Sequence, residues 1–172
     1  MLKSFESEQS NEQIDEAAEE LSPDSRDLRK ETEAVWNLIR LDGIKILLVE
    51  DTLDARIYIS RMFIRAGAVV LTASSVQEAR QILLHDEPDV IVSDIAMPDE
   101  DGLSFIRKLR ASGDLSGAHI PAMALTAFTD SQTRNQIFKA GFQAHVAKAS
   151  NFTLMLKTVC DLAKGETGDI VH

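Results

Sequence analysis

The sequence predicts an α/β fold in which five short strands form one parallel sheet and alternate with five helices. Short apolar runs of four to six residues recur from residue 44 onward. Runs of that length are typical of buried strands rather than of buried helices. Longer amphipathic stretches separate the runs, and each parallel crossover needs such a helix. The alternation therefore indicates a parallel sheet with helices on both faces.

The expected strands differ in how strongly their composition indicates them. The first three, at residues 44–49, 69–73 and 89–93, are rich in Val and Ile, which favour strands. The runs at 121–125 and 144–147 contain fewer such residues, and their alternation with helices supports the assignment. Because the runs are nearly continuous in apolar residues, both faces of the sheet are expected to be covered.

The stretches between and after the strands have the spacing of amphipathic helices. We expect helices at residues 53–66, 75–85, 102–112, 130–140 and 151–163. Glycine commonly ends a helix, and Gly67, Gly113 and Gly141 stand where three of them should stop. Gly102 is expected to relieve crowding where the third helix begins. The folded domain should therefore cover residues 41–164, followed by a short tail at 165–172.

Residues 1–40 differ in composition from the rest, and we expect them to form an acidic helical extension. This segment contains 11 acidic and 5 basic side chains. From Ile14 to Leu21 the apolar residues have the spacing of one helix face. Ser22 and Pro23 then have the composition of an N-cap and a first helical position, which predicts a second helix to about Arg40.

The extension has two interpretations. Apolar residues recur every seven positions, at Ile14, Leu21, Leu28 and Val35. This spacing is typical of coiled coils, so a homodimer through the N-terminal helices is one interpretation. Pro23 interrupts the register, and acidic residues occupy intervening positions. The other interpretation is a helical arm packed on its own domain or a partly disordered tail.

Composition argues against several classes of function. Lys and Arg number 18 against 28 Asp and Glu, and the net charge of −10 repels nucleic-acid phosphates, so we expect no nucleic-acid partner. The single cysteine, Cys160, excludes internal disulfides, and a reducing, cytoplasmic compartment fits this. No stretch approaches the ~20 apolar residues that span a bilayer, so no membrane association is expected.

Polar side chains stand at the ends of four expected strands. Glu50 and Asp51 follow the first strand, Asp94 follows the third, Thr126 the fourth and Lys148 the fifth. In open parallel sheets, ligands bind beyond the carboxyl ends of the strands. We therefore expect three carboxylates, a hydroxyl and an ammonium group to converge at one edge of the sheet.

This set of groups is suited to phosphoryl chemistry. Three crowded carboxylates repel one another, and a bound cation relieves that repulsion. With oxygen ligands only, Mg²⁺ is the natural candidate, and it accepts phosphoryl oxygens as further ligands. A carboxylate is also a competent nucleophile toward phosphorus. Lys148 and the Thr126 hydroxyl could share the charge that develops on the phosphoryl oxygens.

At these positions the sequence resembles the receiver domains of bacterial two-component response regulators. The resemblance covers roughly residues 43–164 and includes Glu50 and Asp51 in ILLVED and Asp94 in DIAMPDEDG. It also includes Thr126 in ALTA and Lys148 after AGFQAHVA, and it is greatest for receivers of hybrid histidine kinases. The resemblance implies the strand order 2-1-3-4-5.

The resemblance also implies roles for the residues at this edge. Asp94 would be the phosphoacceptor, Lys148 would pair with it, and Thr126 would bind a phosphoryl oxygen. The implied Mg²⁺ ligands are Glu50, Asp51, Asp94 and the backbone carbonyl of Ala96. The implied donor is a phosphohistidine on a histidine kinase or phosphotransfer protein, and the output is a contact with a downstream protein target. Such a domain is not an enzyme beyond catalysing its own phosphorylation and dephosphorylation.

Two positions depart from the usual pattern of that family. His145 stands where Tyr or Phe is usual. Ala149 replaces the usual proline after the lysine, and a cis bond before a non-proline residue costs ~2.5 to 4 kcal/mol, so we expect a trans or strained loop. In that family, the residues two places after the phosphoacceptor and two places after the threonine flank the approach of the hydrolytic water. Here they are Ala96 and Phe128, and neither can hydrogen-bond a water, which predicts a slowly decaying phosphoprotein.

Three alternatives compete with this interpretation, and the sequence argues against the second and the third. A receiver-like interaction module could act without phosphorylation, which the departure at Ala149 would allow. A phosphohydrolase with an aspartyl nucleophile would need a second Asp at the position of Ala96. A flavodoxin-like FMN site would need a loop that accepts phosphate, whereas Glu50, Asp51 and Asp54 would repel it.

Overall fold

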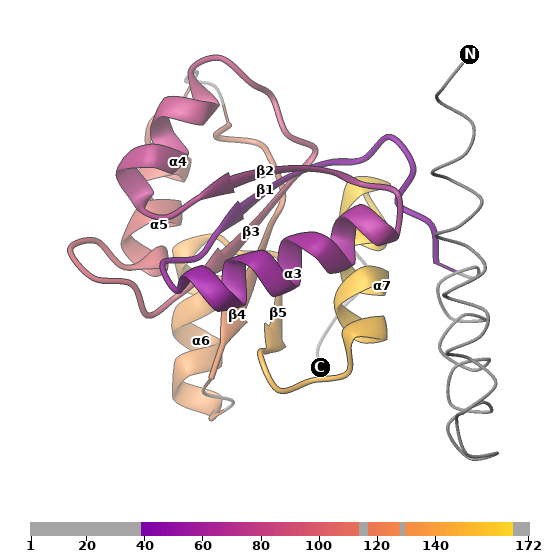
Figure 1. Ribbon diagram of the computed structural model, residues 1–172. Coiled ribbons are helices and arrows are strands. Elements are labelled where there is room, and N and C mark those ends of the chain that lie inside the picture. The colour runs from indigo at the N-terminus through magenta and orange to yellow at the C-terminus, as the bar shows by residue number, and fades with distance from the viewer. Residues whose placement is uncertain (1–38, 114–116, 128–129, 167–172) are drawn as a thin grey trace, which may run out of the picture. The chain divides into compact units, whose positions relative to one another are not determined.

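The structure is a computed structural model that describes residues 39–113, 117–127 and 130–166. The expected helices of the N-terminal extension, with the homodimer built on them, lie outside these residues, as do Phe128 and the last residues of the tail. Within the described part, five strands alternate with five helices, as the sequence predicts (Figure 1).

The elements follow one another along the chain as strand and helix in turn. They are β1 (Lys45–Val49), α3 (Leu53–Arg65), β2 (Val69–Ala73), α4 (Val76–Leu83), β3 (Val90–Asp94), α5 (Gly102–Ala111), β4 (Ala122–Thr126), α6 (Ser131–Ala140), β5 (Ala144–Ala147) and α7 (Phe152–Ala163). Two strands end one residue later than expected, so that Asp94 and Thr126 are their last residues rather than the first residues beyond them.

The strands form one sheet in the order β2-β1-β3-β4-β5, and all four neighbouring pairs are parallel. This confirms the strand order that the family resemblance implies. The order reverses between β1 and β3, and a crevice for a ligand is expected at such a point beyond the carboxyl ends of the strands. The predicted site residues stand at this edge.

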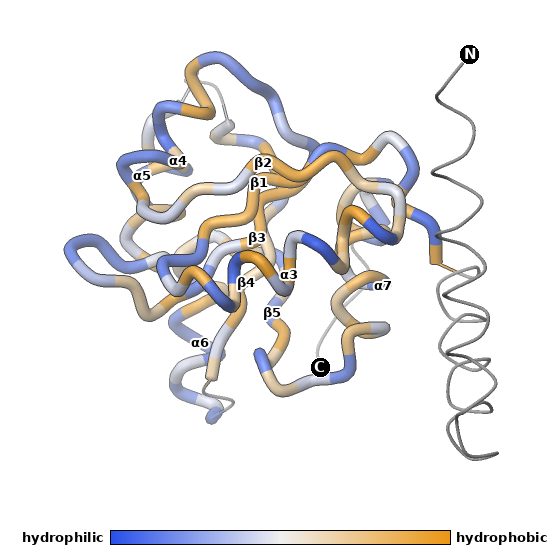
Figure 2. The backbone as a smooth tube through the Cα atoms, in the orientation of Figure 1, coloured by the Kyte–Doolittle hydropathy of each residue, from blue (hydrophilic) through white to orange (hydrophobic). Residues whose placement is uncertain are grey.

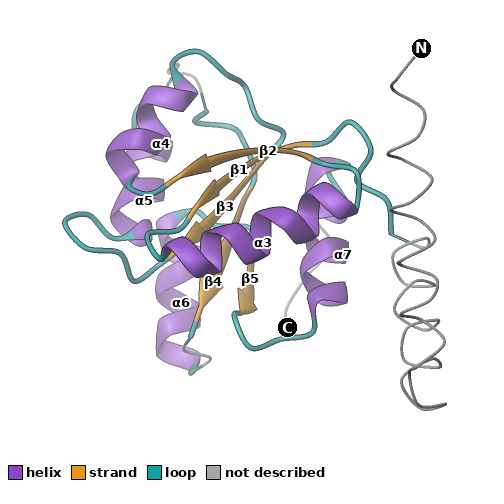
Figure 3. Cartoon of the chain, in the orientation of Figure 1, coloured by secondary structure: helices purple, strands orange, loops and turns teal. Residues whose placement is uncertain are grey.

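Helices cover both faces of the sheet, as Figures 1 and 3 show: α4, α5 and α6 lie on one side, and α3 and α7 lie on the other. The core on the first side joins Leu47 and Ile91 of the sheet to Leu83, Phe105 and Ile137 of the three helices. On the other side, the rings of α3 and α7 meet, with the Phe63 and Phe152 centroids 5.6 Å apart. The inner strands β1, β3 and β4 are apolar along most of their length in Figure 2 and are buried on both faces, whereas the edge strand β2 is partly exposed.

Side chains at the helix ends explain where the helices begin and stop. Ser75, Asp101, Asp130 and Asn151 each accept a hydrogen bond from a backbone N–H of the first turn that follows. Gly141 ends α6 with a φ of 105°, a left-handed conformation that glycine adopts readily. In the part of the chain that the structure describes, no helix is long and apolar enough to cross a membrane.

Candidate functional site

The predicted site residues come together at the carboxyl edge of the sheet. Glu50 and Asp51 follow β1, Asp94 ends β3, and Thr126 ends β4. Lys148 follows β5, and its backbone N–H donates a 2.8 Å hydrogen bond to the carbonyl of Thr126. Adjacent parallel strands in register therefore place these residues side by side, as the sequence predicts.

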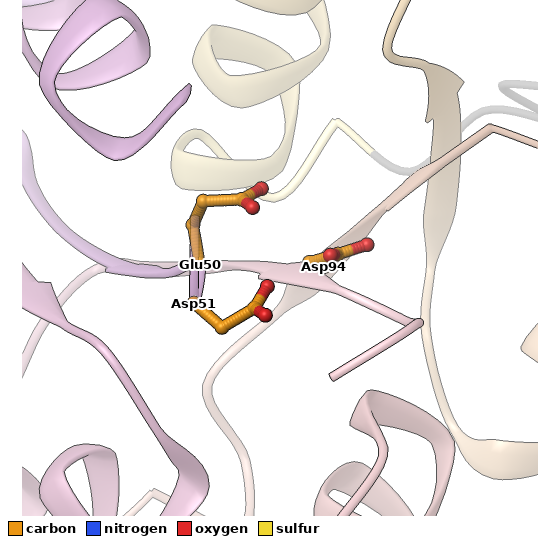
Figure 4. Close-up of side chains that lie close together, drawn as sticks. All are labelled: Glu50, Asp51 and Asp94. Carbon is orange, nitrogen blue, oxygen red and sulfur yellow. The ribbon is translucent and has the colours of Figure 1, made fainter. Parts of the chain in front are cut away.

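Glu50, Asp51 and Asp94 form a carboxylate cluster, shown in Figure 4, in which one oxygen of each residue lies within 4.8 Å of the others. Glu50 is fully buried, Asp94 is 4% exposed, and Asp51 is half-buried. Carboxylates this close and this poorly hydrated repel one another when ionised. The cluster is therefore a place where positive charge is stabilised.

Lys148 supplies part of that positive charge. Its Nζ lies 2.9 Å from Asp94 Oδ2 and 2.8 Å from Glu50 Oε2. Burial disfavours the ammonium form, but the contacts with Glu50 and Asp94 outweigh this, so the pKa of Lys148 is raised above its usual value. The lysine is therefore a charged partner of both carboxylates at neutral pH.

The cluster fits a hard divalent cation. One ammonium group faces three carboxyl groups, so the cluster can carry a net negative charge. Glu50 Oε2 is buried, and the Lys148 ammonium group at 2.8 Å is shared between it and Asp94. Buried negative charge that is only partly compensated is costly. Oxygen donors alone, carrying this net charge, match the preference of Mg²⁺.

Neighbours in β3 and in the loop that follows it hold Asp94 by its backbone and by its side chain. The Ala96 N–H donates to Asp94 Oδ1 at 3.2 Å, and the Ser93 hydroxyl donates to the Asp94 carbonyl at 2.8 Å. A Cβ on Gly102 would stand 2.2 Å from that same carbonyl oxygen. Only glycine fits there, which confirms that Gly102 relieves crowding at the start of its helix.

The far end of this loop is held by ion pairs that sequence reasoning did not find. Glu100 contacts Arg80 of α4 at 2.8 Å and Lys108 of α5 at 3.1 Å. Hydrogen bonds from Arg80 are the main cause of a lowered pKa of Glu100, and the contact with Lys108 adds to the effect. Burial opposes it but is outweighed. The loop that begins at Asp94 is thus attached to two helices.

Arg56 of α3 is a second residue near the site that sequence reasoning did not single out. Its Nη1 donates to the carbonyl of Glu50 and, at 3.1 Å, to the carbonyl of Asp51. One signal could have identified it. The helix dipole favours anions near the N-terminus and disfavours cations there. An arginine in the first turns of a helix therefore indicates a specific contact that compensates for this effect.

Both departures from the family pattern lie in described residues. His145 is buried in β5, and its ring makes an edge contact with Phe138 of α6 at 5.7 Å between centroids. The Lys148–Ala149 peptide bond is trans, as expected, and every other described peptide bond is trans as well. A Ser150 N–H to Ala147 carbonyl hydrogen bond of 2.9 Å closes the turn after β5.

Comparison with known proteins identifies the class to which this fold and site belong. Residues 46–160 match the response regulator receiver domain, and the chain belongs to that family. It is 34% identical over 128 residues to hybrid signal transduction histidine kinase D of Dictyostelium discoideum. That alignment covers 71% of this chain and 8% of the kinase, so the chain spans less than a tenth of that relative.

Many solved structures have the same fold, and two of them show the degree of similarity. The chemotaxis response regulator CheY4 of Vibrio cholerae is 28% identical, with a TM-score of 0.63, over 69% of this chain and 98% of the other. The receiver domain of a sensor histidine kinase of Pseudomonas aeruginosa is 27% identical, with a TM-score of 0.64, over 71% and 98%. That structure has a magnesium ion coordinated in its active site cleft.

Proposed function

We propose that the chain is a phosphoacceptor that takes a phosphoryl group from a phosphohistidine onto Asp94. The observation that carries this proposal is the contact of the Asp94 carboxylate with Lys148, at 2.9 Å, inside a carboxylate cluster. In the reaction, a carboxylate oxygen of Asp94 forms a bond to phosphorus. The bond from phosphorus to the donor's imidazole nitrogen breaks, and the imidazole leaves with the electron pair.

Among the three carboxylates, Asp94 is the one suited to be the nucleophile. Glu50 is fully buried, and its Oε1 accepts a 3.3 Å hydrogen bond from the Thr52 N–H. Asp51 lies in the same loop, and its carboxylate has no hydrogen-bond donor among the described residues. Asp94 ends the central strand, and both of its oxygens have donors that hold the carboxylate in one orientation. A fixed orientation favours reaction with a docked donor.

The remaining residues neutralise charge around the transferred group. Bound Mg²⁺ would supply positive charge to the phosphoryl oxygens, held by Glu50, Asp51, Asp94 and the carbonyl of Ala96. Lys148 would move from the Asp94 carboxylate to a phosphoryl oxygen, since its flexible stem carries a mobile point charge. Thr126, 2% exposed at the end of β4, would donate its hydroxyl to another such oxygen.

The donor that we propose is a histidine kinase or a phosphotransfer protein. Helix α3 starts three residues after Glu50 and exposes four large apolar side chains: Leu53, Ile57, Tyr58 and Ile64. Exposed apolar surface beside a site supports a protein partner that covers it. Transfer of the phosphoryl group would then switch a contact with a downstream protein, in a cytoplasmic setting that the single buried Cys160 supports.

Labelling with a small phosphodonor tests this proposal. Acetyl phosphate with Mg²⁺ should add one phosphoryl group to the protein, and a chelator should prevent the addition. Asp94→Asn should abolish it with an unchanged circular dichroism spectrum. Asp99→Asn is the matched control, because Asp99 is exposed in the same loop and asparagine tolerates its φ of 66°. An unlabelled wild type would favour the phosphorylation-independent module.

A further inference from the structure

Arg56 attaches the loop that carries two of the three carboxylates. This loop, residues 50–52, connects β1 to α3. The half-buried Arg56 guanidinium reaches back from α3, and one nitrogen donates to the carbonyls of both Glu50 and Asp51. Hydrogen bonds from a charged donor are the stronger kind, so this contact fixes two successive peptide groups.

The orientation of those peptide groups sets where the carboxylates point. The Glu50 N–H is bonded to the Ala73 carbonyl at 3.0 Å, which fixes the start of the loop. The Arg56 N–H is bonded to the Thr52 carbonyl at 2.9 Å, which fixes its end. Between these two points, the carbonyls of Glu50 and Asp51 both point toward the Arg56 guanidinium, which donates to them. The Glu50 and Asp51 side chains meet Asp94 in one cluster (Figure 4).

Charge alone would give Arg56 the opposite effect on a bound cation. A guanidinium a few residues from a cation site repels the cation, so removing it should tighten binding on electrostatic grounds. Its positive charge also acts on the first turn of the neighbouring helix α4. There the pKa of Glu78 is lowered chiefly by hydrogen bonds from Ser74, with Arg56 adding to the effect. The geometric and electrostatic effects of Arg56 therefore differ in sign.

We propose that Arg56 is a positioning residue for the divalent cation, acting through the carbonyls of Glu50 and Asp51. This inference rests on the proposed function, since it takes the carboxylate cluster as the cation site. Outer partners that orient metal ligands typically change metal affinity about 10- to 100-fold when they are removed. Loss of the Arg56 contact should therefore weaken Mg²⁺ binding, although a positive charge is lost.

The test is calorimetric titration of the full chain with Mg²⁺ alone. We expect Arg56→Met to bind Mg²⁺ about 10-fold more weakly than the wild type. Arg56→Lys keeps the charge but replaces the broad guanidinium with a point donor, and it should also bind more weakly. The matched control is Arg61→Met, which removes an exposed charge from the same helix and should leave the affinity within about twofold.

The outcomes separate the two proposals. Wild-type protein that binds no Mg²⁺ contradicts the proposed function and removes the basis of this inference. Wild-type protein that binds Mg²⁺, with Arg56→Met binding as tightly or more tightly, overturns the role of Arg56 alone. As a second readout, the Mg²⁺ concentration for half-maximal labelling by acetyl phosphate should rise in both Arg56 variants, while the rate at saturating Mg²⁺ stays near that of the wild type. If Arg56→Met does not fold, Arg56→Lys decides by the same comparison.

Discussion

Lys148→Met should make the stability of the protein depend strongly on divalent cations. Methionine keeps much of the stem of the lysine but removes the ammonium group that contacts Asp94 and Glu50. The side chains of these carboxylates are 5% and 0% exposed, so they lose their counter-charge in a place where water cannot replace it. Without a divalent cation, the variant should therefore unfold more easily than the wild type.

The size of the effect follows from burial. Removing one partner of a buried ion pair costs about 3 to 5 kcal/mol. The Lys148 side chain is 30% exposed, and solvent screens part of its interaction, so we expect a loss of about 2 to 3 kcal/mol in the free energy of unfolding. Mg²⁺ at 100 times its Kd adds about 2.7 kcal/mol to the wild type. At the same Mg²⁺ concentration, the gain in the free energy of unfolding should be larger for the variant. The cation then supplies the charge that the lysine no longer provides, so the variant binds it more tightly.

Urea unfolding at pH 7, with a chelator and with Mg²⁺, measures both quantities. Lys157→Met is the matched control, since Lys157 is exposed on α7, and it should lie within about 0.5 kcal/mol of the wild type in both conditions. The reasoning fails if Lys148→Met loses less than about 1 kcal/mol in chelator. It also fails if Mg²⁺ does not narrow the gap to the wild type.

Three further predictions concern the same edge of the sheet. Gly102→Ala should lower the free energy of unfolding in urea by about 1 to 3 kcal/mol and reduce labelling, because the new Cβ displaces the Asp94 carbonyl. A variant as stable as the wild type would show that the Asp94 carbonyl does not exclude a side chain at position 102. The raised pKa of Lys148 means that its ion pairs stabilise the protein below its usual pKa of 10.5. The difference in unfolding free energy between the wild type and Lys148→Met, measured in chelator, should therefore persist up to that pH. It should be lost as the pH rises through the folded-state pKa of Lys148. A loss of the difference at lower pH would argue against a raised pKa of Lys148. Ala96→Asn with Phe128→Glu should hasten loss of the label after the donor is removed, since both new side chains can orient water; an unchanged lifetime would show that these positions do not set it.

The sequence was sufficient to predict the sheet and the edge at which the site lies. Apolar periodicity locates the strands, and the carboxyl ends of parallel strands lie at one edge of the sheet. The sequence alone therefore predicts that Asp51, Asp94 and Lys148 lie close together. The exact strand ends at Asp94 and Thr126 were one residue off, because strand pairing, not composition, decides where a strand ends.

The residues that orient the site could not be predicted in this way. The Arg56 guanidinium donates to backbone carbonyls. Every residue has a backbone carbonyl, so the sequence does not indicate which ones a side chain will contact. Glu100 is one acidic residue in an acidic loop, and its partners Arg80 and Lys108 lie on two helices whose separation only the fold defines. Long side chains that bridge elements are set by tertiary packing, which local periodicity does not encode.

The most direct test of the central claim is to locate the phosphoryl group by chemistry. Protein treated with acetyl phosphate and Mg²⁺ is reduced with borohydride, which converts an aspartyl phosphate to homoserine, and its peptides are mapped by mass spectrometry. We predict homoserine at position 94 in the Mg²⁺ sample and unmodified Asp94 in the chelator sample. Homoserine at another aspartate, or an acid-labile label on a histidine with Asp94 unchanged, would contradict the assignment of Asp94 as the phosphoacceptor.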